Sequence, residues 1–191
     1  VFIGLWALSF QLNFAVSLIS TPIPYLTKEF VGGVDVESAT MASYGVILSL
    51  GYVAITIGSL LGGFVSDAVG RKKVVFVSFI MLAVGCGLFA VAPGLYWLFL
   101  AGFIEMFAVG FCGPAISALV ADCTAQSSRG MAYGVYNLSW VVAQIPAPLL
   151  GGVIAQFLNL RAPFIIAVSI GMIGMLFSIF MKGKNVEHRR V

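Results

Sequence analysis

The chain has 191 residues, of which 61% are hydrophobic and only 9% are charged. A domain that folds in water carries charges on roughly a quarter of its residues, so this composition excludes a water-soluble domain and indicates a lipid bilayer as the main solvent. The formal net charge of +3 does not indicate a nucleic-acid-binding protein, because the basic residues fall in loops and a tail rather than on one continuous face.

Long apolar segments predict six membrane-spanning helices. A bilayer core about 30 Å thick needs about 20 apolar residues per helix. Transmembrane strands would alternate apolar and polar residues over about 10 positions, whereas the apolar runs here are continuous and twice that length. We therefore expect an all-α membrane protein with helices at 2–24, 41–66, 74–92, 95–121, 130–157 and 163–181, and with 25–40 as the longest external loop.

The loops between these helices predict the orientation of the chain. One set of loops holds Arg71, Lys72, Lys73, Arg129, Lys182, Lys184, Arg189 and Arg190, whereas the opposite set holds only Lys28 and Arg161. Because Lys and Arg are retained on the cytoplasmic side, we expect both ends of this segment to be cytoplasmic. We expect no signal peptide, a trimmed start, and an integral protein of the plasma or inner membrane.

The residue content argues against catalysis and metal binding. The only histidine, His188, lies in the tail, and the cysteines Cys86, Cys112 and Cys123 form no CxxC pattern. A serine protease within the membrane would need a serine and a histidine in the spans. We therefore expect no enzyme, no metal site and no cofactor.

The turn after the second predicted helix carries the most specific pattern. Gly63, Asp67 and Gly70 precede three bases in the order G-x3-D-x2-G-R-K-K. Gly63 would let the helix end approach its neighbours, and Gly70 would permit a turn that other residues resist. Asp67 can accept hydrogen bonds from backbone amides or pair with an arginine. The alternative interpretation is that the three bases only hold this loop on the cytoplasmic side. That role would not require glycine and aspartate at fixed positions before them.

This pattern resembles the loop between helices two and three of the major facilitator superfamily, a family of secondary transporters. The resemblance implies that the element, Gly63, Asp67, Gly70, Arg71 and Lys72, latches two six-helix halves in the outward-open state. It implies that Asp67 and Arg71 carry this role and that Asp122, at the cytoplasmic end of the fourth helix, joins them. The family often has arginine directly after the aspartate, where this chain has Ala68, so a thinner charge network is expected.

The fifth predicted helix carries a second pattern. Its residues fit the spacing G-x8-G-x3-G-P-x2-G-G, with alanine in place of glycine at two positions. The six residues of the pattern are Gly134, Ala143, Ala147, Pro148, Gly151 and Gly152. The pattern resembles the antiporter signature of drug:proton exporters in the same superfamily. Small residues allow close helix packing, and Pro148 removes a helix hydrogen bond and bends the chain, an effect to which Pro146 adds. A generic kinked and tightly packed helix is the alternative interpretation.

The fourth predicted helix departs from the family. The family often carries an arginine there in R-x3-G-x-G, whereas the matching stretch from Gly102 to Gly110 has none. Glu105 instead lies about 12 Å from the external end of the helix. An ionised carboxylate at this depth costs several kcal/mol unless it is paired, so we expect it to face the bundle interior or a wet cavity. It would carry a proton or bind a cationic substrate, or else stay protonated and bond to a neighbouring helix.

Other polar residues within the spans are candidates for the lining of a substrate cavity: Gln11 and Asn13 in the first helix, Tyr44 and Tyr52 in the second, and Asn137, Trp140 and Gln144 in the fifth. Asn137 and Gln144 are seven residues apart and share a helix face, whereas Gln11 and Asn13 point in different directions. Hydrogen bonds between helices would explain each of them as well as substrate contact does.

The resemblance covers the whole chain but corresponds to half of the usual transporter. It implies a half bundle of six helices built as 3+3 inverted repeats. Residues 1–181 would form the amino-terminal domain, and 182–191 would begin a cytoplasmic linker. A second six-helix half, either a missing carboxy-terminal domain or another copy, would complete the protein, and a small-molecule substrate would bind between the halves.

The leading hypothesis is a secondary active transporter that exports small amphipathic or cationic molecules in exchange for protons by alternating access. It depends on the fifth-helix pattern and on Glu105. A basic residue facing the cavity would favour an anionic substrate, and the predicted spans contain none. A symporter or facilitator for a nutrient such as a sugar or an organic acid is the alternative within transport. A non-transporting membrane scaffold or sensor is the alternative of another class.

Overall fold

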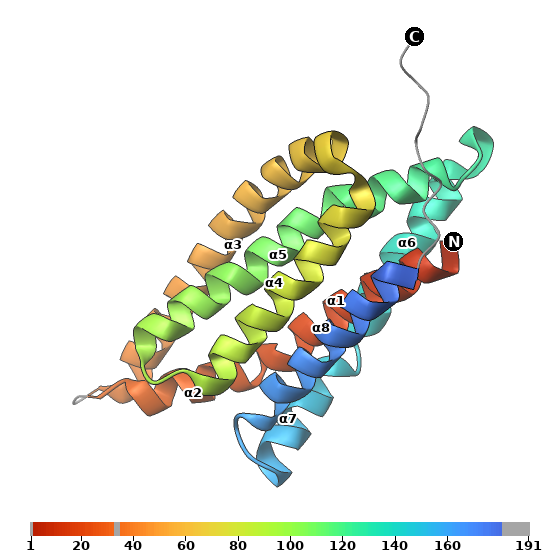
Figure 1. Ribbon diagram of the computed structural model, residues 1–191. Coiled ribbons are helices and arrows are strands. Elements are labelled where there is room, and N and C mark those ends of the chain that lie inside the picture. Colours follow the sequence, from red (N-terminus) through yellow and green to blue (C-terminus); the bar gives the residue numbers. More distant parts are fainter. Residues whose placement is uncertain (1, 33–34, 181–191) are drawn as a thin grey trace.

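The computed structural model describes residues 2–32 and 35–180. In these residues the elements are α1 (Phe2–Ser20), α2 (Pro22–Phe30), α3 (Val36–Val69), α4 (Arg71–Val91), α5 (Leu95–Asp122), the short 3-10 helix η1 (Gln126–Ser128), α6 (Arg129–Gln144), α7 (Ala147–Phe157) and α8 (Ala162–Phe180) (Figure 1). The expected linker 182–191, with His188 and the four basic residues of the tail, lies outside the described residues.

Six segments are long and apolar enough to cross a membrane: Phe2–Ser20, Val36–Val69, Arg71–Val91, Leu95–Asp122, Gln126–Phe157 and Ala162–Phe180. The fifth of these joins η1, α6 and α7. The predicted all-α fold with six membrane spans is therefore confirmed, and the chain is an integral membrane protein.

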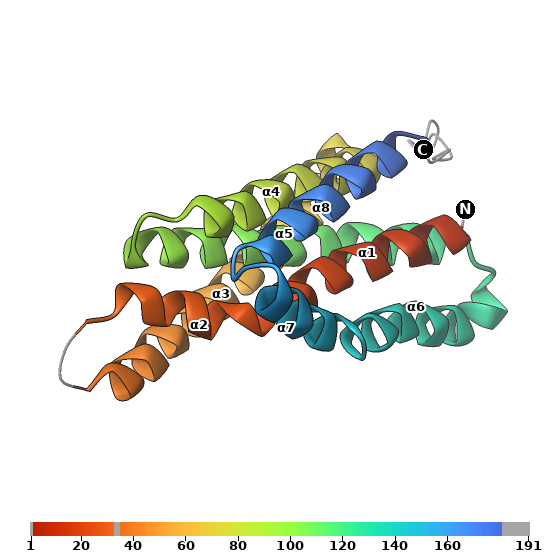
Figure 2. The same ribbon diagram turned by 90° about the horizontal axis from the view of Figure 1, so that it is seen from below.

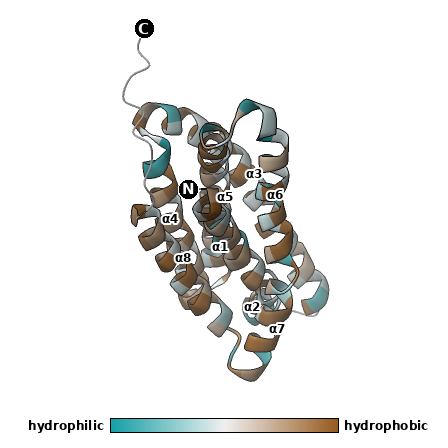
Figure 3. Ribbon diagram, turned by 90° about the vertical axis from the view of Figure 1, so that its right-hand side faces the viewer, coloured by the Kyte–Doolittle hydropathy of each residue, from teal (hydrophilic) through white to brown (hydrophobic). Residues whose placement is uncertain are grey.

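The helices form two flanks around a central pair. Figure 3 shows α1 and α5 in the middle, with α4 and α8 on one side and α3 and α6 on the other. Large side chains such as Leu5, Phe79 and Phe164 fill the interior and are fully buried. Outward-facing residues are also apolar, for example Leu60 and Phe64, which are 62% and 77% exposed. A surface of this kind fits a lipid environment rather than water.

The second and fourth spans, α3 and α5, come into backbone contact near their middle. A Cβ atom added at Gly58 of α3 would lie 2.6 Å from the Phe107 carbonyl oxygen of α5, and one added at Gly62 would collide with the Phe111 carbonyl oxygen. From the other side, Gly110 of α5 lies against Ile55 of α3. In lipid the hydrophobic effect does not drive helices together, so their association depends on close packing. The glycines of α3 and α5 allow this packing, and van der Waals contact stabilises the pair.

The first span differs from the prediction of one helix over 2–24 followed by a loop. Helix α1 ends at Ser20, and α2 occupies residues 22–30. Pro22 and Pro24 have no backbone N–H and cannot continue the helical bonding, whereas a proline at the first position of a new helix is tolerated. Leu26 and Thr27 of α2 are fully buried. The expected loop is therefore partly a helix that packs against the bundle.

The second span begins five residues earlier than predicted, at Val36 instead of 41. Asp35 caps this helix, because its carboxylate accepts a hydrogen bond of 3.3 Å from the Ser38 backbone N–H. Hydrogen bonding from Ser38 also lowers the pKa of the Asp35 carboxyl. The polar residues that suggested a loop thus form the cap and first turn of a helix.

The fifth span, predicted as one bent helix over 130–157, consists of two helices. Helix α6 ends at Gln144 and α7 begins at Ala147. Pro146 and Pro148 cannot donate to the carbonyls four residues earlier, so the break lies where two helical bonds are lost within three residues. Helices α2 and α7 lie towards the same end of the bundle, opposite the turn between α3 and α4 (Figure 1, Figure 2).

Candidate functional site

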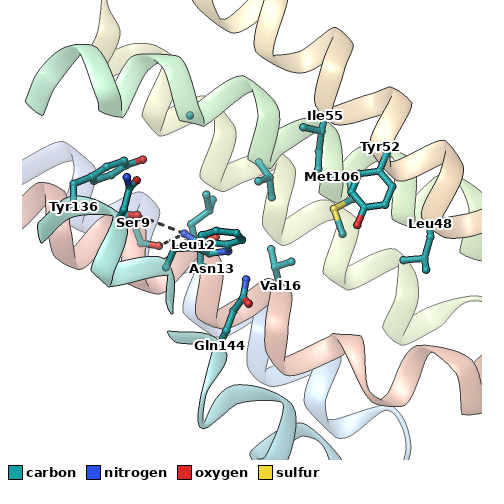
Figure 4. Close-up of a pocket in the computed structure, with 14 residues that line it drawn as sticks. Ser9, Leu12, Asn13, Val16, Leu48, Tyr52, Ile55, Met106, Tyr136 and Gln144 are labelled. Atoms are coloured by element: carbon teal, nitrogen blue, oxygen red, sulfur yellow. Dashed lines mark hydrogen bonds between the residues drawn. The ribbon is translucent and has the colours of Figure 1, made fainter. Parts of the chain in front are cut away.

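A cavity of about 380 Å³ lies between α1, α3, α5 and α6. Its lining, drawn in Figure 4, comprises Ser9, Leu12, Asn13 and Val16 of α1, Leu48, Tyr52 and Ile55 of α3, Met106, Val109 and Gly113 of α5, and Tyr136, Asn137, Trp140 and Gln144 of α6. Tyr52 and Trp140 are 68% and 52% exposed, which shows that the cavity is open on the side of α3 and α6.

The two walls of this cavity differ in chemistry. The α1 and α6 wall carries the polar groups of Ser9, Asn13, Asn137 and Gln144, whereas the α3 and α5 wall is apolar apart from the Tyr52 hydroxyl (Figure 4). None of the described residues that line the cavity carries a formal charge. The cavity therefore matches a small molecule with one polar edge and one apolar face.

Hydrogen bonds fix the polar wall. The Asn13 amide donates to the Ser9 backbone carbonyl at 2.7 Å. The hydroxyls of Ser9 and Ser139 lie 2.8 Å apart, and Ser139 donates to the Tyr136 carbonyl at 2.6 Å. These bonds join α1 to α6 and fix the side chains of Ser9, Asn13 and Ser139.

Glu105 lies outside this cavity. Its side chain is 1% exposed, and its Oε1 atom has no hydrogen-bond partner in the described part of the chain. It faces α4, where a Cβ atom added at Gly85 would lie 2.8 Å from the Glu105 backbone nitrogen. The carboxyl is thus buried next to α4, and Glu105 is not among the residues that line the cavity.

Gly102 occupies the position at which the R-x3-G-x-G pattern of the sequence analysis would have its arginine. A Cβ atom there would lie 2.9 Å from the Ile47 side chain of α3. The Ile47 side chain thus leaves little room for a Cβ atom at this position. This agrees with the cavity lining, which has no basic residue among the described residues.

Gln11 and Asn13 face different directions, as their spacing predicts. Asn13 lines the cavity, whereas Gln11 lies on another face of α1, in a crevice with Phe10 and Phe14 and with Ile170 and Ile173 of α8. Of the polar candidates in the first and fifth helices, Asn13, Asn137 and Gln144 are brought together, and Gln11 is not.

The turn between α3 and α4 carries a group of charges, which we call the charged turn: Asp67, Gly70, Arg71 and Asp122. Gly70 connects the two helices with φ of +105°, a conformation that favours glycine. Arg71 forms an ion pair with Asp122 and donates to the Ala118 carbonyl at 3.2 Å, so the start of α4 is tied to the end of α5.

Asp67 is held only loosely in the charged turn. Its carboxylate lies 4.0 Å from the Arg71 guanidinium, and its side chain is 77% exposed. Lys72 donates to the Ile179 carbonyl of α8 at 2.7 Å. Gly63 does not approach a neighbouring helix as expected, because a Cβ atom there would meet nothing within 4 Å. Asp67 and Gly63 therefore present an unoccupied surface beside the ion pair.

The proline breaks of the first and fifth spans meet at what we call the proline junction: Leu18, Thr21, Pro22, Pro146, Pro148 and Gly151. A Cβ atom at Gly151 would collide with the Leu18 carbonyl oxygen, and the Thr21 hydroxyl donates to the Pro148 carbonyl at 3.1 Å. Ala143 and Ala147 are fully buried, and Gly152 lies near the Thr21 methyl group, whereas Gly134 meets open space. The small residues near the break are the ones that make close contact.

Sequence reasoning did not single out Ser9, Ser139 or Thr21. Ser9 is four residues before Asn13, a spacing that places both on one helix face. Thr21 begins the segment T-P-I-P, and a hydroxyl beside two prolines is a candidate partner for a free carbonyl. Ser139 has no comparable signal, since serine is a common residue in tightly packed membrane helices.

The sequence profile of the Major Facilitator Superfamily matches residues 5–190. A tetracycline resistance protein, class E, of Escherichia coli is 30% identical over 87% of this chain and 40% of its own length. The multi-drug resistance efflux pump PmrA of Streptococcus pneumoniae is 25% identical over 91% of this chain and 43% of its own length.

Solved structures show the same fold. A crystal structure of the peptide transporter POT in complex with sulfate superposes with a TM-score of 0.76, at 18% identity, over 93% of this chain and 37% of that chain. The chain thus spans about two fifths of the length of these relatives, as a six-helix half would. With the profile match over nearly its whole length, the chain belongs to the major facilitator superfamily.

Proposed function

We propose that the protein is the amino-terminal half of a proton-coupled exporter of small amphipathic or cationic molecules, which works by alternating access together with a second six-helix half. The observation that carries this proposal is the cavity between α1, α3, α5 and α6, with one polar wall and one apolar wall. In this proposal the chain lies in the plasma or inner membrane with both ends of this segment in the cytoplasm.

The size and polarity of the cavity support a small amphipathic cargo. Its volume of about 380 Å³ falls within the range of about 300 to 1,000 Å³ that is usual for small-molecule sites. A planar molecule would place its polar edge against Asn13 and Asn137 and its apolar face against Ile55 and Met106. Because this wall carries no charge, a cationic cargo would need its counter-charge from the second half.

The charged turn supports the proposed latch. Arg71 forms an ion pair with Asp122 and a hydrogen bond to the Ala118 carbonyl. The Asp67 side chain, by contrast, is 77% exposed, and a Cβ atom at Gly63 would meet nothing within 4 Å. In our proposal a helix of the second half contacts this surface in the outward-open state, and Asp67 accepts its hydrogen bonds. The other half would leave this contact when the transporter opens inwards.

Glu105 is our candidate for the proton site. A carboxylate that is 1% exposed, with an unpartnered oxygen, is costly to ionise, so the neutral form suits the conformation described here. If α4 and α5 separate in another conformation, water reaches the carboxyl and the proton can leave. Coupling would then act through helix movement, because Glu105 does not line the cavity between α1, α3, α5 and α6.

The relatives support export as the direction of transport. Their names describe resistance to tetracycline and multi-drug efflux, at 25% to 30% identity over most of this chain. The shared region contains both the charged turn and the small-residue pattern of α6 and α7. This support concerns the half transporter, because the chain spans about two fifths of those proteins.

The test of this function uses the full-length protein in everted vesicles with an acid interior. Lipophilic cations, neutral amphiphiles, sugars and organic acids are added in turn, and the release of protons on addition is recorded. We expect release with amphiphiles or cations and none with sugars. Proton movement with sugars or organic acids alone would overturn the proposal in favour of a nutrient transporter.

Asp67→Asn tests the latch in the same assay. We expect a fall of about tenfold in initial rate, with unchanged expression, because the amide cannot replace a charge-assisted hydrogen bond. Glu37→Gln is the matched control, since Glu37 is an exposed acidic residue at the opposite end of α3. Equal rates in the Asp67→Asn variant and the wild type would rule out the latch.

Glu105→Gln tests the proton site separately. We expect the variant to keep cargo binding but to lose the dependence of transport on the pH gradient, because the amide is similar in size and cannot release a proton. Cargo binding is measured by equilibrium dialysis without a gradient. Wild-type pH dependence in this variant would exclude Glu105 and leave the latch result unaffected.

A further inference from the structure

Gly113 of α5 lines the cavity between α1, α3, α5 and α6, and it is the only glycine among the described residues of that lining. A Cβ atom added at Gly113 would meet nothing within 4 Å in the described part of the chain. Glycine inside a helix is less stable than alanine. A helical glycine that packs against no neighbour therefore calls for an explanation other than helix packing.

The other two glycines of α5, Gly102 and Gly110, differ from Gly113 in this respect. A Cβ atom at Gly102 would lie 2.9 Å from the Ile47 side chain, and one at Gly110 would collide with the Ile55 carbonyl oxygen. These two positions need glycine so that α3 can approach. At Gly113 the missing side chain instead leaves open space in the wall of the cavity.

Gly113 lies at the end of the cavity nearer the charged turn. It is nine residues before Asp122, about 14 Å along α5. At the same end, the Tyr133 hydroxyl of α6 donates to the Ser117 carbonyl of α5 at 3.0 Å. This bond holds the two helices together just beyond the cavity.

Helical spacing brings Asn137 of α6 opposite Gly113. Helices α5 and α6 run in opposite directions, and Gly113 lies four residues before Ser117 while Asn137 lies four residues after Tyr133. Residues four apart share a helix face. Both positions therefore lie one turn farther from the charged turn than the Tyr133–Ser117 bond, and both line the cavity. A cargo whose polar edge binds Asn137 would extend its apolar body over Gly113.

We propose that Gly113 is a specificity-determining residue, which admits flat cargo of two or three fused aromatic rings and at which a larger side chain would restrict the cavity to single rings. An apolar cavity of about 150 Å³ accommodates one benzene ring, so the volume of about 380 Å³ has room for two or three. The inference rests on the proposed function in one respect, namely that cargo binds in this cavity. It does not depend on proton coupling or on the direction of transport.

Binding of three aromatic amidines to the full-length protein in nanodiscs tests this residue. Benzamidine, 2-naphthamidine and 2-anthramidine have one, two and three rings and carry the same cationic donor group for the polar wall. Equilibrium dialysis without a gradient gives the dissociation constants, with empty nanodiscs as the blank. We expect the wild type to bind 2-anthramidine at least about tenfold more tightly than benzamidine, because each added ring buries more apolar surface.

Gly113→Leu should separate the three compounds by size. We expect binding of 2-anthramidine to weaken about thirtyfold and binding of benzamidine to change by less than about twofold, because the added side chain overfills the site only for the larger rings. Gly113→Ala should give the same order with a change of about threefold for 2-anthramidine. Gly45→Leu is the matched control, since a Cβ atom at Gly45 of α3 also meets nothing within 4 Å but Gly45 does not line the cavity.

A double variant keeps the test valid if Gly113→Leu fails to fold. Val109 lies four residues before Gly113 and lines the same cavity. Combining Val109→Ala with Gly113→Ala removes two methyl groups beside the one that is added, so binding of 2-anthramidine should return to within about twofold of the wild type. Gly113→Ala alone should melt no lower than the wild type, because its Cβ atom meets open space and alanine favours a helix.

Three results would overturn the inference. Equal weakening of all three amidines in Gly113→Ala, with a lower melting temperature, would mean that a helix of the second half packs on Gly113. Unchanged binding in both Gly113 variants, with slower transport, would mean that Gly113 and the adjacent Pro114 act as a hinge within α5. No binding of any amidine to the wild type would mean that flat aromatic cations are not the cargo of this cavity. Because binding is measured without a gradient, each result is independent of whether the proposed export is observed.

Discussion

The charged turn and the proline junction hold opposite ends of the same bundle by different physical means. At the charged turn, Arg71 joins α4 to α5 through an ion pair with Asp122, whose side chain is 45% exposed. At the proline junction, Gly151 brings α7 against the backbone of α1, and one hydrogen bond from Thr21 completes the contact. The first connection is soft and sensitive to salt, whereas the second depends on shape and has almost no tolerance for added atoms.

The largest effect is expected for Gly151→Ala. The added Cβ atom would collide with the Leu18 carbonyl oxygen, so the backbones of α1 and α7 must separate. We expect a loss of about 3 kcal/mol in the free energy of unfolding, measured as a fall in melting temperature in detergent. Gly134→Ala is the matched control, because a Cβ atom there meets open space. Equal melting temperatures would show that the junction can relax freely.

An intermediate effect is expected for Arg71→Gln. The variant loses the Asp122 ion pair and weakens the bond to the Ala118 carbonyl, at a cost of about 1 to 2 kcal/mol because both partners are partly exposed. The difference from wild type should shrink as salt rises to about 1 M, where the Debye length falls to about 3 Å. The same salt series should leave the Gly151→Ala difference unchanged. A salt-independent Arg71→Gln effect would contradict an electrostatic tie.

The smallest effect is expected for Thr21→Val. The substitution keeps the shape of the side chain and removes only the hydrogen bond to the Pro148 carbonyl, which should cost about 1 kcal/mol. Thermal melting at low and high salt is the measurement, with Thr56→Val as the control, since the Thr56 hydroxyl bonds within its own helix. A cost above that of Gly151→Ala would show that polar bonding, not close packing, secures the junction.

Much of the architecture could be predicted from the sequence. Span length and loop charge depend on the bilayer more than on tertiary contacts, which explains why the six spans were found. The helix α2 was missed because Lys28 and Glu29 make the segment look like a loop. The hydropathy of a segment does not show whether it packs against other helices, so the burial of Leu26 and Thr27 could not be predicted from it.

The candidate site was predicted less completely, for a reason visible at Glu105. Its depth follows from its position in the helix, but its direction depends on how α4 and α5 pack around Gly85. Spacing alone separates Gln11 from Asn13, and the structure shows that separation. Spacing does not tell which of the two faces the cavity. In a helix that is apolar on all sides, the sequence contains little information on that choice.

The uncharged lining of the cavity between α1, α3, α5 and α6 has a consequence for the energetics of the proposed transport cycle. Moving one elementary charge across a membrane potential of 100 mV is worth about 2.3 kcal/mol. Because the described lining contributes no fixed charge, the electrogenicity of the cycle would be set by the cargo, the coupling ion and the second half. One charged substitution in that second half would then change how strongly the membrane voltage drives accumulation, without any change in the shape of the wall described here.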